Sequence, residues 1–191
     1  MKTVQPKLIV GIGGSAGSLN AYKALLNAIP HDTGIAFVFI THLMPDSHIQ
    51  LANILQRQTK MSVLVAAEAT EILANHVYVI PSDSDFTLDN YRFIIISPRI
   101  SRNKPVDVFF ISLANEMSER AVGIVLSGYG ADGTEGCRHI KANGGTTFAQ
   151  DESAEVDAMP LSAKAAGCID FVLPVDKIPA KLKKLVDSLK R

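Results

Sequence analysis

Three polar residues, Ser15, His42 and Asp132, each follow a run of apolar residues typical of a buried strand. A serine hydroxyl can attack a carbonyl carbon, an imidazole can take the hydroxyl proton, and a carboxylate can hold the imidazole in one orientation. If the three runs are parallel strands of one sheet, their carboxyl ends lie at the edge where such sheets bind ligands. These residue types in these places predict nucleophilic acyl transfer.

The segment around Ser15, residues 11–17 with the sequence GIGGSAG, fits two motifs. As GxSxG it predicts a tight strand-to-helix turn that exposes the serine oxygen. As GxGxxA it predicts a turn where the pyrophosphate of a dinucleotide approaches a helix N-terminus. The dinucleotide motif also requires an Asp or Glu roughly 20 residues further on, at the end of the second strand. Thr41 and His42 stand there instead, so we favour the serine site and expect no cofactor.

His42 and Asp132 also have purely structural interpretations. A histidine at a strand end is often only a hydrogen-bonded structural residue. Asp132, with Glu135 three residues later, fits a capping box for the helix that follows it. Both roles are compatible with catalysis, because a capping carboxylate can still orient an imidazole. We therefore expect Asp132 to orient His42.

Two backbone N–H groups are candidate oxyanion donors. Ala16 follows Ser15 at the start of a predicted helix, and Tyr129 lies in the glycine-rich turn over residues 128–133. No two histidines have the i,i+4 spacing of metal ligands, so we expect no metal.

Alternating strand and helix patterns must position these residues. Strands are predicted over residues 8–12, 35–41, 62–66, 76–80, 91–97, 121–127, 145–149 and 169–173. Helices are predicted over residues 19–28, 49–59, 106–117, 133–143 and 159–166, and an apolar stripe over 178–189 also has helical spacing. The alternation predicts an α/β fold, a doubly wound and mostly parallel sheet with helices on both faces. Residues 75–80 and 91–97, separated by a Ser/Asp-rich stretch, predict a small antiparallel excursion.

Composition excludes several classes of protein. The 191 residues contain 19 Lys or Arg and 19 Asp or Glu, so no net charge attracts nucleic acid to the whole surface. The chain is 47% hydrophobic and 20% charged, which is typical of a folded domain. Two cysteines are too few for a disulfide scaffold, and apolar residues nowhere run together far enough to insert into a membrane. A single domain in the cytoplasm is expected.

Collinear motifs extend these observations over nearly the whole chain. They are VGIGGSAGS at 10–18, FITHLMP at 39–45, VYVIPSD at 77–83, PVDVFFISLA at 105–114, VLSGYGADGTEG at 125–136, and the stretch from Gly144 through AQDESAEVDAMPLSA. The set resembles the catalytic domain of the chemotaxis protein-glutamate methylesterase family (CheB-type). Several phrases look most like the version fused to a methyltransferase domain. Ser18 departs from the family pattern, which commonly has a second glycine there.

The resemblance implies a serine hydrolase that demethylates glutamate methyl esters on chemoreceptor-type proteins and in some members deamidates glutamine. It implies Ser15 as nucleophile, His42 as base and Asp132 as orienting acid, with the Ala16 and Tyr129 amides in the oxyanion site. It also implies one catalytic domain over residues 1–191, with a core of about 7–185, and a regulatory receiver or methyltransferase domain outside this chain. The alternative is a non-catalytic docking or regulatory module with an esterase fold.

Overall fold

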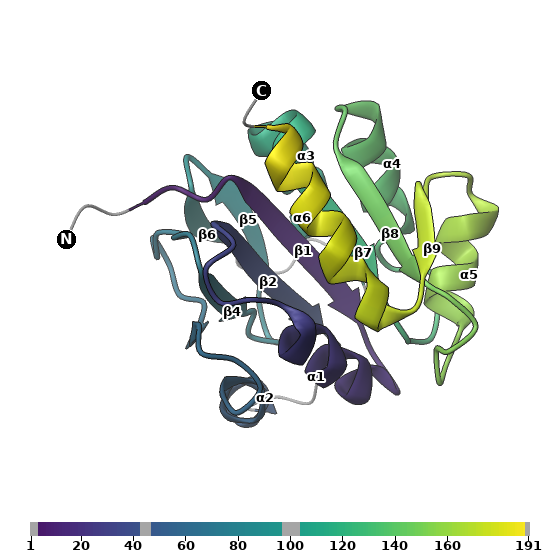
Figure 1. Ribbon diagram of the computed structural model, residues 1–191, viewed down its shortest axis with the longest axis horizontal. Coiled ribbons are helices and arrows are strands. Elements are labelled where there is room, and N and C mark those ends of the chain that lie inside the picture. Colours follow the sequence, from purple (N-terminus) through teal and green to yellow (C-terminus); the bar gives the residue numbers. More distant parts are fainter. Residues whose placement is uncertain (1–3, 43–46, 97–103, 190–191) are drawn as a thin grey trace.

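The computed structural model describes residues 4–42, 47–96 and 104–189, and its centre is a seven-stranded parallel sheet (Figure 1). The strand order is β3-β4-β2-β1-β7-β8-β9. The strands are β1 (Leu8–Gly14), β2 (Ile35–Thr41), β3 (Ser62–Val65), β4 (His76–Val79), β7 (Ala121–Val125), β8 (Thr146–Gln150) and β9 (Phe171–Leu173). Residues 43–46, which include the end of the FITHLMP motif, and residues 97–103, which include the end of one predicted strand, lie outside the described residues.

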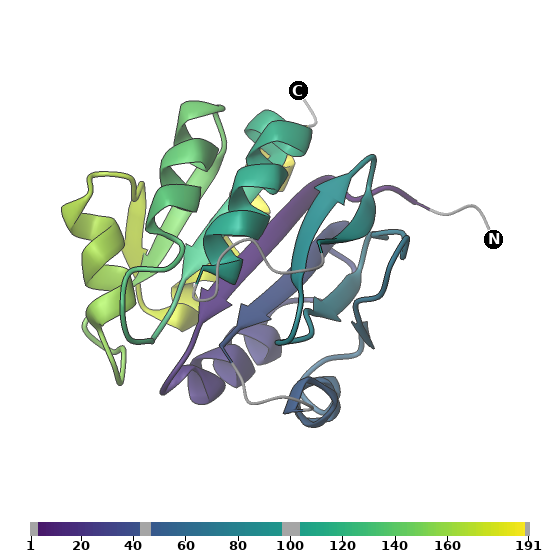
Figure 2. The ribbon, with the colours of Figure 1, turned by 180° about the vertical axis from the view of Figure 1, so that it is seen from behind.

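Six α-helices in the described residues cover the sheet on both faces (Figures 1 and 2). They are α1 (Ser18–Ala28), α2 (Ser47–Gln56), α3 (Pro105–Met117), α4 (Thr134–Ala142), α5 (Ala158–Ala165) and α6 (Ile178–Ser188). Helices α1, α2 and α6 share one hydrophobic core with the sheet, and α3, α4 and α5 share another on the opposite face. The predicted doubly wound fold is confirmed.

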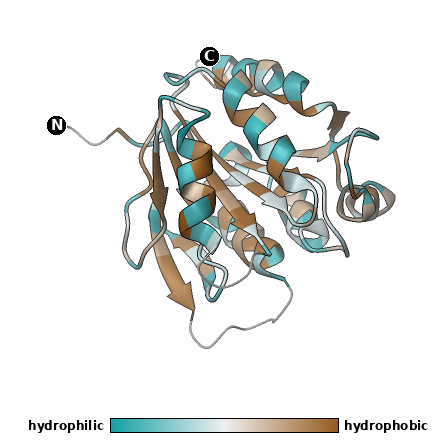
Figure 3. Cartoon of the chain, turned by 90° about the horizontal axis from the view of Figure 1, so that it is seen from below, coloured by the Kyte–Doolittle hydropathy of each residue, from teal (hydrophilic) through white to brown (hydrophobic). Residues whose placement is uncertain are grey.

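Strands β1 and β2 are buried along their whole length because both faces of the sheet are covered. Figure 3 shows this pattern as hydrophobic strands between helices that alternate hydrophobic and hydrophilic residues. Successive β1 residues point to opposite faces, so Val10 joins the core under α1 and α6 whereas Ile9 joins the core under α3.

The glycines of β1 accommodate α3. A Cβ atom on Gly11 would lie 2.6 Å from Phe110 Cε1, and one on Gly13 would lie 2.5 Å from Val106 Cγ1. These separations are below van der Waals contact, so α3 packs on β1 only because both residues are glycine. The GxGxxA spacing is therefore explained by helix packing, and the dinucleotide interpretation loses its main support.

The antiparallel excursion is a hairpin of β5 (Asp85–Asp89) and β6 (Arg92–Ile96). Our prediction that residues 75–80 belong to it was wrong, since β4 pairs in parallel with both β2 and β3. Strand β5 lies within the Ser/Asp-rich stretch that separates residues 75–80 from residues 91–97, where no strand is predicted. Its Phe86 and Leu88 are buried against α3 and alternate with polar residues, which is the period of a strand.

Both cysteines, Cys137 and Cys168, are free and buried. Among the described residues, every helix is too short or too polar to span a bilayer.

Candidate active site

Ser15 and His42 follow the carboxyl ends of neighbouring strands. In the parallel pairing of β1 with β2, Gly14 lies opposite Thr41. Ser15 and His42 are the next residues along each strand, and adjacent strands lie about 4.8 Å apart. The strand register therefore brings these two residues to one edge of the sheet.

Residues 15–18, which we call the Ser15 turn, lead from β1 into α1. The Ser18 N–H donates to the Ser15 carbonyl oxygen at 3.2 Å. Gly17 has φ 73° and ψ 1°, which fit the third position of a type II turn. A Cβ atom there would also lie 2.8 Å from Ser127 Oγ. The turn thus requires glycine at position 17 for both its backbone conformation and its close packing.

Ser127, at the end of β7, holds the Ser15 turn in place. Its carbonyl oxygen accepts from the Ser15 N–H at 2.9 Å, and its hydroxyl donates to the Ala16 carbonyl oxygen at 2.8 Å. The same hydroxyl accepts from the Val156 N–H at 2.9 Å, and the Ser127 N–H donates to Gln150 Oε1 at 3.1 Å. Ser127 is fully buried, and its bond to Gln150 is shielded from competition with water.

Asp132 binds two elements that are distant in sequence. Its Oδ1 accepts from the Asp107 N–H at 2.9 Å, and its Oδ2 accepts from the Val106 N–H at 3.0 Å and lies 2.7 Å from His42 Nε2. The two amides belong to the first turn of α3, where the helix dipole favours a negative charge. The carboxylate is thereby fixed and stabilised beside the imidazole.

The predicted capping box at α4 was wrong. Gly133, with φ 91°, is the N-cap residue of α4, and no side chain caps that helix. Glu135 instead contacts the side chains of Arg138 and His139 at 3.8 and 3.5 Å. Asp132 does cap a helix, but its carboxylate is turned toward α3.

The contact with Asp132 determines which nitrogen of His42 is available. An ionised carboxylate only accepts hydrogen bonds, so the proton of a neutral His42 ring lies on Nε2. The lone pair is then on Nδ1, for which no described residue is a hydrogen-bond partner. The His42 side chain is 27% exposed and that of Asp132 is 5% exposed. The nitrogen of His42 that has no described partner is therefore the one suited to accept a proton.

Of the three candidate residues, only two are joined by a hydrogen bond. His42 and Asp132 are directly hydrogen-bonded, whereas no bond joins the Ser15 hydroxyl to His42 in the described structure. Hydrogen bonds between a nucleophile and its base are often long in structures without substrate. Ser15 has an ordinary negative φ, and the left-handed residue of its turn is Gly17.

The two predicted oxyanion amides border Ser15. A Cβ atom on Gly128 would lie 3.0 Å from both Ser15 N and Ser15 Cβ, so this glycine brings Tyr129 close to the serine. Within the described residues, neither the Ala16 N–H nor the Tyr129 N–H has an acceptor. Both N–H groups therefore stay candidate oxyanion donors.

A second buried carboxylate, Asp107, links α3 back to α4. Its Oδ1 accepts from the Gly136 N–H at 2.8 Å, so each helix start is bound by an acid from outside that helix. Burial raises the pKa of Asp107, and the charge of Asp132 raises it further, whereas the Gly136 N–H lowers it.

In the described part of the chain, no three His, Cys, Asp or Glu side chains are grouped to hold a metal ion.

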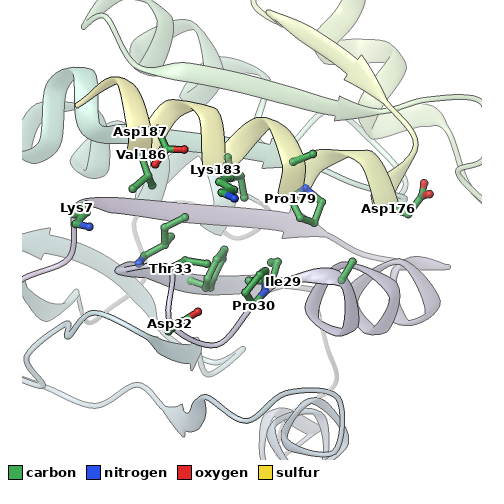
Figure 4. Close-up of a pocket in the computed structure, with 15 residues that line it drawn as sticks. Lys7, Ile29, Pro30, Asp32, Thr33, Asp176, Pro179, Lys183, Val186 and Asp187 are labelled. Carbon is green, nitrogen blue, oxygen red and sulfur yellow. Dashed lines mark hydrogen bonds between the residues drawn. The ribbon is translucent and has the colours of Figure 1, made fainter. Parts of the chain in front are cut away.

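Two cavities differ in their relation to Ser15. One of about 210 Å³ adjoins the Ser15 turn and is lined by Ser15, Gly17, Ser18, Leu19, Tyr22, Ser47, Gln50, Leu51 and Ile54. A larger one of about 490 Å³ lies between α6 and the segment that joins α1 to β2 (Figure 4). It includes Lys7 and Thr33, which precede β1 and β2, so it lies at the opposite end of these strands from Ser15.

The sequence did not indicate the roles of Ser127, Gln150 or the first amides of α3. Ser127 had a weak signal, since it ends a predicted strand next to the turn that holds Tyr129. The binding of Asp132 to α3 had none, because its partners lie 25 and 26 residues away.

Comparison with known proteins decides the family. The family model described as CheB methylesterase matches residues 10–182. This chain belongs to the CheB methylesterase family. The resemblance noted in the sequence and the predicted fold are both confirmed.

Relatives within the CheB methylesterase family match most of this chain. A Leptospira interrogans protein, named as a putative protein-glutamate methylesterase/protein-glutamine glutaminase, is 33% identical over 87% of this chain and 89% of its own length. A Geobacter metallireducens protein-glutamate methylesterase/protein-glutamine glutaminase 1 is 37% identical over 94% of this chain, which spans only 51% of that protein. The Thermotoga maritima CheB methylesterase catalytic domain aligns with a TM-score of 0.85 at 30% identity, covering 93% of this chain and 98% of the other.

Proposed function

We propose that this chain is a serine hydrolase that removes the methyl group from glutamate methyl esters on chemoreceptor-type signalling proteins. The observation that carries the proposal is the 2.7 Å contact between His42 Nε2 and Asp132 Oδ2 at the sheet edge that also bears Ser15. Membership of the CheB methylesterase family supports the choice of substrate, since its relatives are named protein-glutamate methylesterases.

Acylation would begin at Ser15. As Ser15 Oγ attacks the ester carbonyl carbon, His42 Nδ1 takes the hydroxyl proton and the ring becomes an imidazolium. Asp132 stabilises that cation through Nε2, and its own charge is kept in place by the Val106 and Asp107 amides.

The tetrahedral intermediate carries a negative oxygen, which the Ala16 and Tyr129 N–H groups would bind. His42 returns its proton to the ester oxygen, the carbon–oxygen bond breaks, and methanol leaves. Water then attacks the acyl-enzyme while His42 again takes a proton, which releases the glutamate carboxylate and restores Ser15. With glutamine, the same steps release ammonia, and we propose this deamidation as a slower second activity because an amide nitrogen is the poorer leaving group.

Methanol release from a methylated receptor tests the proposal. We expect Ser15→Ala to lower the rate by about 10⁴-fold or more, because the nucleophile is lost. Ser188→Ala is the matched control, since Ser188 is exposed on α6 and away from the sheet edge. Equal rates for wild type and Ser15→Ala would refute the proposal.

The non-catalytic docking alternative has no observation in its favour, and the relatives are named as enzymes. As proposals we retain a single catalytic domain over residues 1–191 with a core of about 7–185, and a cytoplasmic location. Control by a receiver or methyltransferase domain outside this chain is also a proposal. It is supported by the Geobacter relative, of which this chain spans only 51%.

A further inference from the structure

Ser18 hydrogen-bonds to the peptide that carries a candidate oxyanion donor, the Ala16 N–H. It is the first residue of α1 and is only 4% exposed. Its hydroxyl donates to the Ser15 carbonyl oxygen at 2.5 Å, and its own N–H donates to the same oxygen at 3.2 Å. The Ser15 carbonyl oxygen thus accepts two hydrogen bonds from one residue.

These bonds also determine the direction of the Ala16 N–H. The Ser15 carbonyl and the Ala16 N–H belong to one planar trans peptide, in which the C=O and N–H bonds point in opposite directions. With the carbonyl held toward α1, the N–H points away from that helix, and no described residue accepts from it. Its direction is set before any ligand binds.

The neighbouring peptides are held by Ser127 and not by Ser18. Ser127 accepts from the Ser15 N–H and donates to the Ala16 carbonyl oxygen. The peptide between these two is the one that carries the Ala16 N–H, and among the described residues only Ser18 hydrogen-bonds to it. Ser18 is therefore the residue whose side chain acts on the oxyanion amide.

We propose that the Ser18 hydroxyl is a positioning group that aligns the Ala16 N–H for the oxyanion of the tetrahedral intermediate. The inference rests on the proposed function. Preorganised donors accelerate a reaction because they need no reorientation as charge develops.

Ser18→Ala tests the inference, because alanine keeps the backbone bond at 3.2 Å and removes the hydroxyl bond to the Ser15 carbonyl. We expect kcat for methanol release to fall about tenfold with KM unchanged, less than the 10²–10³-fold loss on removing an oxyanion donor outright. A p-nitrophenyl phosphonate supplies a second readout. Ser15 displaces p-nitrophenolate to form an Oγ–P bond, and the rate of labelling should fall by a similar factor. Ser18→Gly should behave in the same way.

Ser188→Ala is the matched control, since the Ser188 hydroxyl makes the same bond to the carbonyl three residues earlier, at 2.7 Å from Leu185 O. It should leave kcat and labelling unchanged. Thermal melting of each variant shows that the assays are run on folded protein. Unchanged kcat and labelling in Ser18→Ala, or a rise in KM alone, would overturn the inference. Ser15→Ala in the same series tests the proposed function separately: an inactive variant supports it, and wild-type activity refutes it. In the second case the rate of Ser15 labelling in Ser18→Ala still tests the role of the Ser18 hydroxyl.

Discussion

His42 Nε2 lies 2.7 Å from Asp132 Oδ2, and that same oxygen accepts the Val106 N–H at the start of α3. One carboxylate therefore holds both an imidazole at the edge of the sheet and a helix on one of its faces. Substitution of Asp132 should therefore lower both activity and stability.

Asp132→Asn tests both effects in one variant. The amide cannot both accept from the α3 amides and accept from His42 Nε2–H, because one of its polar atoms is a donor. We expect kcat to fall by about 10⁴-fold, as when an orienting acid is neutralised elsewhere. The free energy of unfolding should fall by about 1–3 kcal/mol because a buried donor loses its partner. Urea unfolding and methanol release measure the two quantities. Normal activity in a destabilised variant would mean that Asp132 serves α3 alone.

The part of the site that depends on strand register was predictable. Ser15 and His42 each follow a strand, and parallel pairing brings such residues to one edge regardless of the details of packing. The orientation of Asp132 was not predictable, because local spacing to Glu135 suggested a cap whereas the true partners lie on α3. The choice between two helix starts is made by tertiary packing, which has no local signature.

Strand β5 shows a different limit. Phe86 and Leu88 alternate with polar residues over only five positions, and the turn to β6 has Asn90 and Tyr91 at φ 46° and 59°. Two positive φ values fit a type I′ hairpin turn, whose usual sequence signal is Asn-Gly. Because Tyr91 stands where that signal has glycine, the sequence did not indicate the hairpin turn.

Asp107→Asn should stabilise the protein near neutral pH. Burial and the charge of Asp132 raise the pKa of Asp107 in the folded state, so between its unfolded and folded pKa values the folded protein binds more protons. Wild-type stability therefore falls as pH rises through that window. Asparagine stays neutral and can still accept from Gly136. The stability advantage of the variant should be small at pH 3 and larger at pH 7 in urea unfolding. An advantage that shrinks as pH rises would contradict this account.

Gly13→Ala should destabilise the protein through α3. The new methyl group would lie 2.5 Å from Val106 Cγ1, and overpacking of this kind costs about 1–3 kcal/mol. Val106→Ala removes the clashing atoms, so the double variant should be more stable than the sum of the two single changes predicts. Urea unfolding of all four proteins gives the coupling energy. Strict additivity would mean that Gly13 is required for something other than the approach of α3.

Ser127→Ala tests whether the Ser15 turn must be held for activity. The change leaves the part-buried Val156 N–H and Ala16 carbonyl without this partner, at a cost of about 2 kcal/mol. Thr147→Val is the control, since Thr147 is equally buried and its hydroxyl also bonds to one backbone carbonyl and one backbone N–H, those of Cys168 and Asp170, besides Asp170 Oδ2 at 3.0 Å. Both variants should lose similar stability in thermal melting, and only Ser127→Ala should lose kcat, by about tenfold, because its bonds orient the peptides on either side of the oxyanion amide. Equal loss of kcat in both would show that general stability, and not the Ser15 turn, limits the rate.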